Sequence, residues 1–164
     1  MKKIWIHHLF ISEGHNFRGR HNLGALDFPI VDLLSLDLIA GHGIKGDRFY
    51  DPKGENTKRQ ITFFEHEVYE QVRDQLCEGD LHPSRFRRNV VISDLVFDLL
   101  DLVGKEFSIG DALFLGVEEA APCYWMDEAC APGTHEFLKG KGGLRCKILN
   151  DSQIFKGKAS LEIM

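Results

Sequence analysis

The sequence predicts a mainly β protein: a closed or partly closed β-barrel with one main helix and short helical insertions. Short apolar segments recur along the chain and are separated by turns that contain glycine and aspartate. Only one segment carries the regular apolar spacing of a longer helix. The 164 residues show no repeat, linker or low-complexity segment, so we expect one domain over residues 1–164.

The first half of the chain predicts three strands. Residues 3–11 alternate loosely between apolar and polar side chains, and so do residues 33–40. Three leucines of the second segment fall on one face: Leu34, Leu36 and Leu38. Both segments therefore predict half-buried strands, whereas the apolar residues 61–64 are typical of an interior strand.

The main helix is predicted over residues 65–79. Val68, Val72 and Leu76 recur at four-residue spacing, which places them on one apolar face. Gly79 follows this pattern, and glycine is the residue type that most often ends a helix. We therefore expect this helix to pack its apolar face against the barrel.

The second half of the chain predicts a short helix over residues 94–102 and several more strands. The strands are expected over residues 88–92, 105–109, 112–118, 144–149, 153–155 and 160–163. So many short strands at even spacing, with only one long helix, predict an all-β barrel with helical insertions.

Composition excludes several classes of function. A net charge of −5 disfavours nucleic acid as a partner, because phosphate binding requires a basic surface. No apolar run approaches the roughly 20 residues that a membrane helix needs, and polar residues interrupt any signal-peptide core at the N-terminus. We therefore expect a cytoplasmic protein that binds neither nucleic acid nor membrane.

The four cysteines are Cys77, Cys123, Cys130 and Cys146. They form no C-x-x-C pair, so we expect free thiols and no zinc site. Cys77 lies beside the apolar face of the helix and Cys146 on the apolar face of its strand, so both are expected in the core. Cys123 follows a strand and Pro122, where the chain leaves the sheet, and such positions often carry chemistry.

Six motifs in register carry a resemblance to a known family. They are GIKGDRF at 43–49, RQITFF at 59–64, FRRNVVIS at 86–93, GKEFSIGDALF at 104–114, PCYWMD at 122–127 and FLKGKGGLRCKIL at 137–149. With these motifs the chain resembles the MOSC domain family, named for the C-terminal region of molybdenum cofactor sulfurases, and in particular its small stand-alone bacterial members. The resemblance implies a compact β-barrel, a reactive cysteine at Cys123, and molybdenum cofactor binding or sulfur transfer.

The chemistry of Cys123 agrees with this resemblance. A thiolate suits molybdenum in a pterin dithiolene, because that metal centre is soft and binds sulfur. The same thiolate can instead carry sulfur as a persulfide. Four carboxylates close in sequence disfavour a thiolate: Glu118, Glu119, Asp127 and Glu128. The hypothesis therefore requires positive charge that converges on Cys123 from elsewhere in the chain.

Basic and glycine-rich segments supply candidates for binding the cofactor. Arginine forms bidentate hydrogen bonds to phosphate, and glycine-rich backbone exposes N–H groups. The candidates are Lys58, Arg59, Arg87, Arg88, Asn89, Lys141, Gly142, Gly143 and Arg145. Lys141 stands where the resemblance leads us to expect arginine, which weakens a bidentate grip.

Two roles stay open for each of three residues: Asn89, Tyr124 and Trp125. Asn89 either holds a loop, which we favour, or contacts the ligand. Tyr124 and Trp125 either wall a flat pterin or cap the core, and for Trp125 the core role is favoured.

Two functions follow from the sequence. The first is an enzyme or sulfur-transfer protein that uses Cys123 in cofactor maturation or in partner-dependent reduction of N-hydroxylated compounds. The alternative is a non-catalytic cofactor carrier. The sequence shows no flavin motif or iron–sulfur cysteine array, and we expect no nicotinamide cofactor. The expected partner is therefore a cysteine desulfurase or an electron-transfer protein.

Overall fold

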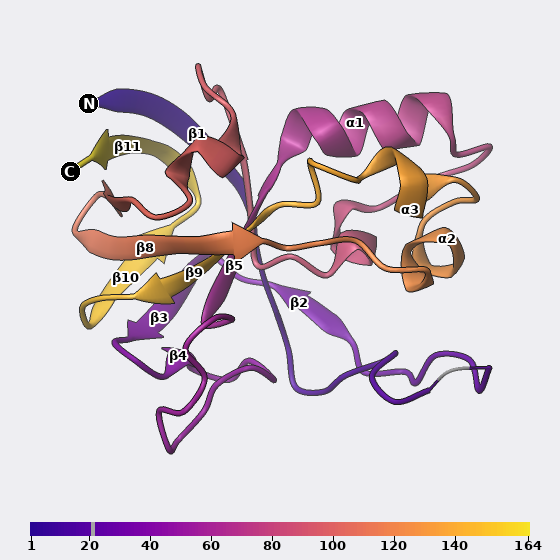
Figure 1. Ribbon diagram of the computed structural model, residues 1–164, viewed down its shortest axis with the longest axis horizontal. Coiled ribbons are helices and arrows are strands. Elements are labelled where there is room, and N and C mark those ends of the chain that lie inside the picture. Colours follow the sequence, from indigo (N-terminus) through magenta and orange to yellow (C-terminus); the bar gives the residue numbers. More distant parts are fainter. Residues whose placement is uncertain (21) are drawn as a thin grey trace.

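Seven strands close into a barrel in the computed structural model, which describes residues 1–20 and 22–164 (Figure 1). In barrel order they are β1 (Lys2–Ser12), β6 (Val90–Ser93), β5 (Ile61–Glu65), β9 (Leu144–Ile148), β8 (Ala112–Glu119), β7 (Glu106–Ile109) and β11 (Gly157–Ile163). Pairing of β11 with β1 closes the ring. Only the β5–β6 pair is parallel among the described barrel strands. The predicted mainly β barrel is confirmed.

Smaller elements surround the barrel. β2 (Ile30–Asp32) pairs with the end of β1, and a separate small sheet contains β10 (Ser152–Phe155), β3 (Ser35–Ile39) and β4 (Gly43–Ile44). The helices are α1 (His66–Gln75), α2 (Trp125–Ala129) and α3 (Thr134–Phe137), with 3-10 turns η1 (Pro83–Phe86) and η2 (Leu99–Leu102). Figure 1 shows all three α-helices at the same end of the barrel.

The barrel interior is filled by alternating side chains of its strands. Phe63, Phe107 and Phe114 lie at its centre, with ring centroids 5.2 to 5.8 Å apart. Each of these rings is almost completely buried. Cys146 lies in the same core, as its strand pattern predicts.

A second core lies between the barrel and the helices. Successive residues of a strand point to opposite faces, so Phe63 enters the barrel while Phe64 enters this second core. There Phe64 packs on Phe86, with 4.8 Å between ring centroids, and contributes to the cluster that contains Val68 and Val72. The apolar face predicted for the helix is therefore the face that α1 buries.

Four details differ from the expectations. The helix predicted to end at Gly79 ends at Gln75. Leu34 is 79% exposed, because β3 begins one residue later and Leu34 lies in the connection from β2. Regular helical structure in residues 94–102 is confined to η2, where the side chain of Asp98 accepts a hydrogen bond from the Leu100 N–H. Cys77 is half-buried at the edge of the second core rather than inside it.

No helix in the described ranges, 1–20 and 22–164, is long and apolar enough to cross a membrane.

Candidate functional site

A cavity of about 300 Å³ lies where the chain leaves the end of β8, and Cys123 is in its wall. Cys123 is exposed and lies just before α2. The volume is at the lower end of the range for small-molecule sites, which is about 300–1,000 Å³. The exit from β8 therefore places the thiol predicted to be reactive beside a ligand-sized cavity.

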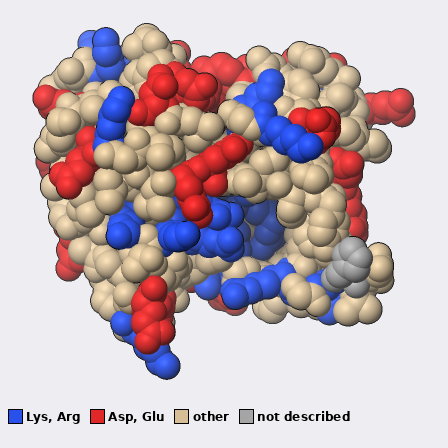
Figure 2. All heavy atoms as spheres, viewed as in Figure 1, with Lys and Arg blue, Asp and Glu red and all other residues tan. Residues whose placement is uncertain are grey.

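Seven arginines line this cavity, and we call it the arginine cavity. They are Arg18, Arg48, Arg59, Arg85, Arg87, Arg88 and Arg145. No aspartate or glutamate lines it within residues 1–20 and 22–164. Figure 2 shows lysine and arginine side chains gathered around a hollow in the surface. So much positive charge at one site favours an anionic ligand.

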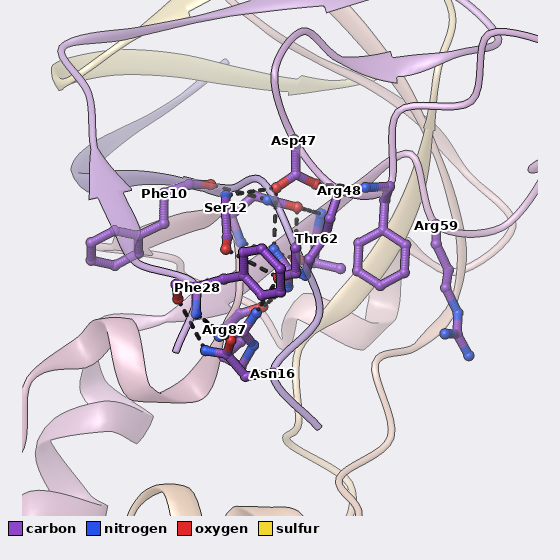
Figure 3. Close-up of polar contacts among 12 residues, drawn as sticks. Phe10, Ser12, Asn16, Phe28, Asp47, Arg48, Arg59, Thr62 and Arg87 are labelled. Carbon is purple, nitrogen blue, oxygen red and sulfur yellow. Dashed lines mark hydrogen bonds and ion pairs between the residues drawn. The ribbon is translucent and has the colours of Figure 1, made fainter. Parts of the chain in front are cut away.

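Two of these arginines have guanidinium groups that are free to bind. Within the described residues, the guanidinium groups of Arg18 and Arg59 make no hydrogen bond or ion pair. Arg59 lies 5.9 Å from the centroid of the Phe49 ring, and Figure 3 shows it pointing away from the neighbouring polar network. Burial lowers the pKa of Arg59, and repulsion from Arg145 and Arg18 lowers it further.

Arg48 and Arg87 belong to a buried polar network (Figure 3). The Asp47 carboxylate accepts hydrogen bonds from the Ser12 N–H at 3.1 Å and from Arg48 Nη1 at 3.2 Å. Arg48 Nη2 donates to the carbonyl of Arg87, and Arg87 Nη2 donates to the carbonyl of Gly14 at 3.0 Å. Burial and repulsion from Arg48 lower the pKa of Arg87 to about 10. This network fixes the N-terminal segment that forms one wall of the cavity.

Three of the four acidic residues close to Cys123 in sequence have other partners. Glu118 accepts a hydrogen bond from Arg145 Nη1 at 2.9 Å and lies 3.8 Å from Lys58 Nζ. Lys58 therefore pairs with Glu118 and is not part of the cavity wall.

Glu119 and Asp127 accept backbone N–H groups instead. The Glu119 carboxylate accepts the N–H of Gly142 at 3.2 Å, and the Asp127 carboxylate accepts the N–H of His135 at 2.8 Å. Neither side chain lines the cavity. None of the four carboxylates that disfavour a thiolate in the sequence lines the cavity, whereas the arginines converge on it.

Four other predicted site residues lie outside the cavity wall. Asn89 is buried, where its Oδ1 accepts hydrogen bonds from the backbone and hydroxyl of Thr62 and its Nδ2 donates to the Phe10 carbonyl. Lys141 Nζ lies 4.1 Å from the centroid of the Phe137 ring. The remaining two, Gly142 and Gly143, form a buried turn behind the Cys123 segment.

Aromatic side chains complete the cavity wall. Trp125, expected in the core, is half-buried and lines the cavity, with its ring 4.9 Å from that of Phe17. Phe49 forms another part of the wall and carries Arg48 over its face at 4.9 Å. These rings offer flat apolar surfaces beside the charged ones.

The other three thiols differ from Cys123 in their surroundings. Burial raises the pKa of Cys130 to about 12 and that of Cys146 well above its ordinary value. Both therefore stay protonated at neutral pH. Cys77 donates a hydrogen bond to the carbonyl of Gly79 and lies away from the cavity.

Sequence reasoning missed three arginines of the cavity. Arg48 lies in the motif at 43–49 and Arg85 immediately precedes the one at 86–93, yet neither residue was singled out as a site candidate. Arg18 lies in the segment GHNFRGRHN at 14–22, which has no strand or helix pattern. Arginines inside or beside the family motifs were the available signal.

His15 makes the stability of the protein depend on pH. Burial lowers the pKa of His15, and the guanidinium groups of Arg48 and Arg18 lower it further. The unfolded chain then binds this proton more readily than the folded chain, so stability is lost as the pH falls through about 6.5.

We expect His15→Gln to lose less stability than the wild type between pH 7.5 and pH 5.5. Urea unfolding at both pH values measures this as the change in midpoint. Part of the loss remains in the variant, because burial and the neighbouring His66 also lower the pKa of His7. Equal losses in the two proteins would contradict the role given to His15.

In a comparison with known families, residues 37–158 match the MOSC domain. Comparison with curated proteins finds no match.

Several solved structures share the fold. The YuaD protein from Bacillus subtilis has a TM-score of 0.75 and 18% identity, with 98% of this chain and 95% of that chain covered. YiiM from Geobacillus stearothermophilus has a TM-score of 0.66 and 14% identity, with 98% and 75% covered. YiiM from Escherichia coli has a TM-score of 0.60 and 18% identity, with 80% and 64% covered. At these identities the likeness extends to the fold alone.

Proposed function

Because the chain belongs to the MOSC domain family, which is associated with molybdenum cofactor binding and sulfur transfer, we propose that it binds the molybdenum cofactor in the arginine cavity. In this proposal Cys123 is the reactive thiol, either as a ligand to the metal or as a carrier of sulfur. The observation that carries the proposal is an exposed cysteine in the wall of a cavity lined by seven arginines and by no described carboxylate.

The residues present fit this cofactor. Its phosphate is anionic, and Arg18 and Arg59 have guanidinium groups available for charge-assisted hydrogen bonds. Its pterin is flat, and Phe17 and Trp125 offer ring faces in the wall. Its molybdenum is a soft metal for which the thiolate of Cys123 is a matched ligand. When bound, the group supplies a redox-active metal centre.

The chain's own residues would bind and orient this group. Arg87 holds the carbonyl of Gly14 and thereby fixes the wall that faces α2. Cys123 is exposed in the wall of the cavity, so a partner protein can reach it. We propose a cysteine desulfurase as partner for sulfur transfer in cofactor maturation, or an electron-transfer protein for reduction of N-hydroxylated compounds. A reducing compartment such as the cytoplasm keeps this thiol available.

A non-catalytic carrier is the second candidate. The observation that favours it is the exposure of Cys123, because a cofactor held at an exposed thiol is accessible for transfer to another protein. Retention of cofactor without turnover of N-hydroxylated compounds in the presence of reductant would separate the carrier from the enzyme.

We expect Cys123→Ala to abolish capture of the cofactor or of sulfur without unfolding the protein. Anaerobic native mass spectrometry measures the adducts after incubation with molybdenum cofactor and, separately, with a cysteine desulfurase and cysteine. A cofactor-sized adduct in the wild type alone supports a Cys123-dependent cofactor site, and one added sulfur supports a carrier. Because Cys123 is exposed, the melting temperature of the Cys123→Ala variant should differ from that of the wild type by only about 1–2 °C.

Cys77→Ala is the matched control, because it removes a thiol that lies outside the cavity. It should capture cofactor and sulfur as the wild type does. Wild-type capture by Cys123→Ala would contradict the role of the thiol. Absence of both adducts from folded wild-type protein would contradict the proposed function.

A further inference from the structure

We propose that Arg88 is a positioning residue, which holds the Cys123 segment (residues 120–124) against the glycine turn (residues 140–143). The other arginines of the cavity then bind the anionic groups of the cofactor. The reference to cofactor rests on the proposed function, whereas the positioning role itself concerns the protein without ligand.

The hydrogen bonds of Arg88 carry this inference. Its Nε donates to the carbonyl of Gly142 at 2.8 Å, and its Nη2 donates to the carbonyl of Ala120 at 2.8 Å. Its Nη1 donates to the carbonyl of Phe86 at 3.2 Å. One planar guanidinium group thus joins three backbone segments: the glycine turn before β9, the segment after β8 that leads to Cys123, and its own 3-10 turn η1. Each of its three nitrogens is engaged with the protein's own backbone.

The glycine turn is packed closely against the same segment. A Cβ atom on Gly142 would lie 2.4 Å from the carbonyl oxygen of Ala120 and 3.0 Å from Cδ of Pro122. The Ala120 N–H also donates to the Gly143 carbonyl at 2.7 Å. The segment that leads to Cys123 is therefore held by a close contact that leaves no room for a side chain on Gly142, and by the hydrogen bonds of Arg88.

Arg88 also differs from its neighbours in electrostatics. No described carboxylate pairs with it, whereas Arg48 pairs with Asp47 and Arg145 with Glu118. Burial and repulsion from Arg145 lower the pKa of Arg88 to about 10, and Cys123 is the group that most opposes this effect. Arg88 therefore brings a fixed positive charge to the side of the cavity where Cys123 lies.

Lysine cannot reproduce this arrangement. Its single ammonium nitrogen carries the charge, but it cannot span three carbonyl groups as the planar fork of arginine does. Glutamine keeps part of the hydrogen bonding and loses the charge. The two substitutions therefore separate the charge of Arg88 from its geometry.

Hydrogen exchange of the protein without cofactor tests the positioning role. We expect Arg88→Lys and Arg88→Gln to speed exchange by about tenfold in peptides that cover residues 119–126 and 140–144. Peptides from β1 and β11 should exchange at the wild-type rate. Alkylation of Cys123 by iodoacetamide at pH 7.5 should be slower in Arg88→Gln than in Arg88→Lys, which keeps the charge.

Two further variants make the test specific. Arg73→Gln removes an exposed positive charge from α1 and should leave both readouts unchanged. Gly142→Ala displaces the Cys123 segment while Arg88 is intact. It should therefore also speed hydrogen exchange in the peptides that cover residues 119–126 and 140–144, even if the Arg88 variants fail to fold.

Wild-type exchange at residues 119–126 in the Arg88 variants, together with weaker cofactor capture, would overturn the proposal and make Arg88 a direct ligand contact. Faster exchange across β1 and β11 as well would also overturn it, because the role would then be general stability. Both exchange results are obtained without cofactor, so a failure of the proposed function leaves this test intact.

Discussion

The double variant Arg18→Gln/Arg59→Gln is expected to weaken capture of molybdenum cofactor by about a hundredfold, because a hydrogen bond to a charged group contributes about 1.5–3 kcal/mol. These two arginines have free guanidinium groups, so their loss removes ligand contacts without breaking hydrogen bonds of the protein. The remaining arginines of the cavity have bonds to the protein itself. Anaerobic equilibrium dialysis at fixed ionic strength measures the affinity.

A matched control removes two positive charges outside the cavity. Lys2→Gln/Lys158→Gln changes the net charge by the same amount, on β1 and β11, and should leave the affinity within about twofold of wild type. Raising the salt concentration should weaken capture by the wild type more than by the double arginine variant, since fewer charges then contribute. Equal affinities of the double arginine variant and the wild type would show that the ligand phosphate binds elsewhere.

The largest expected effect on stability comes from Phe63→Ala. Phe63 is fully buried in the barrel, where its ring lies 5.2 Å from Phe114 and 5.8 Å from Phe107. Truncating it leaves a cavity that seven closed strands cannot easily collapse, so the free energy of unfolding should fall by about 3–5 kcal/mol. Urea unfolding followed by circular dichroism measures this loss.

Phe155→Ala is the control for this substitution. Phe155 lies in β10 and is 59% exposed, so its truncation should change the free energy of unfolding by less than about 1 kcal/mol. Similar losses in the two variants would mean that the barrel interior does not dominate the stability. If Phe63→Ala loses much of its free energy of unfolding but still captures cofactor, the barrel core contributes to stability and not directly to cofactor binding.

The arginines of the arginine cavity have two different roles. Arg18 and Arg59 are available to a ligand, whereas Arg87 and Arg88 hold carbonyl groups of the protein. Buried arginines that bind backbone carbonyls shape the wall, and free ones supply contacts. The effects of their substitution should therefore differ in kind: lost affinity for the first pair, and displaced or loosened segments for the second.

Local patterns in the sequence determined most of the secondary structure. Alternation identified the strands at β1 and β9, because each of them buries one face in the closed barrel. The apolar run at β5 identified a strand that is buried on both faces. Four-residue spacing identified α1, because its apolar face packs on the second core. Leu34 was misplaced, since a leucine in a turn fits the same alternation as a leucine in a strand.

The sequence by itself also singled out Cys123, because its place after a strand and Pro122 is a local property. Only the tertiary structure decided which basic groups meet it. Arg18, Arg59 and Arg145 come from separate segments, and the closure of the barrel brings them to one cavity. The same closure pairs Glu118, an acidic neighbour of Cys123 in the sequence, with Arg145. The pairing of strands that are far apart in the sequence sets the distances between these side chains, so no local sequence pattern predicts them.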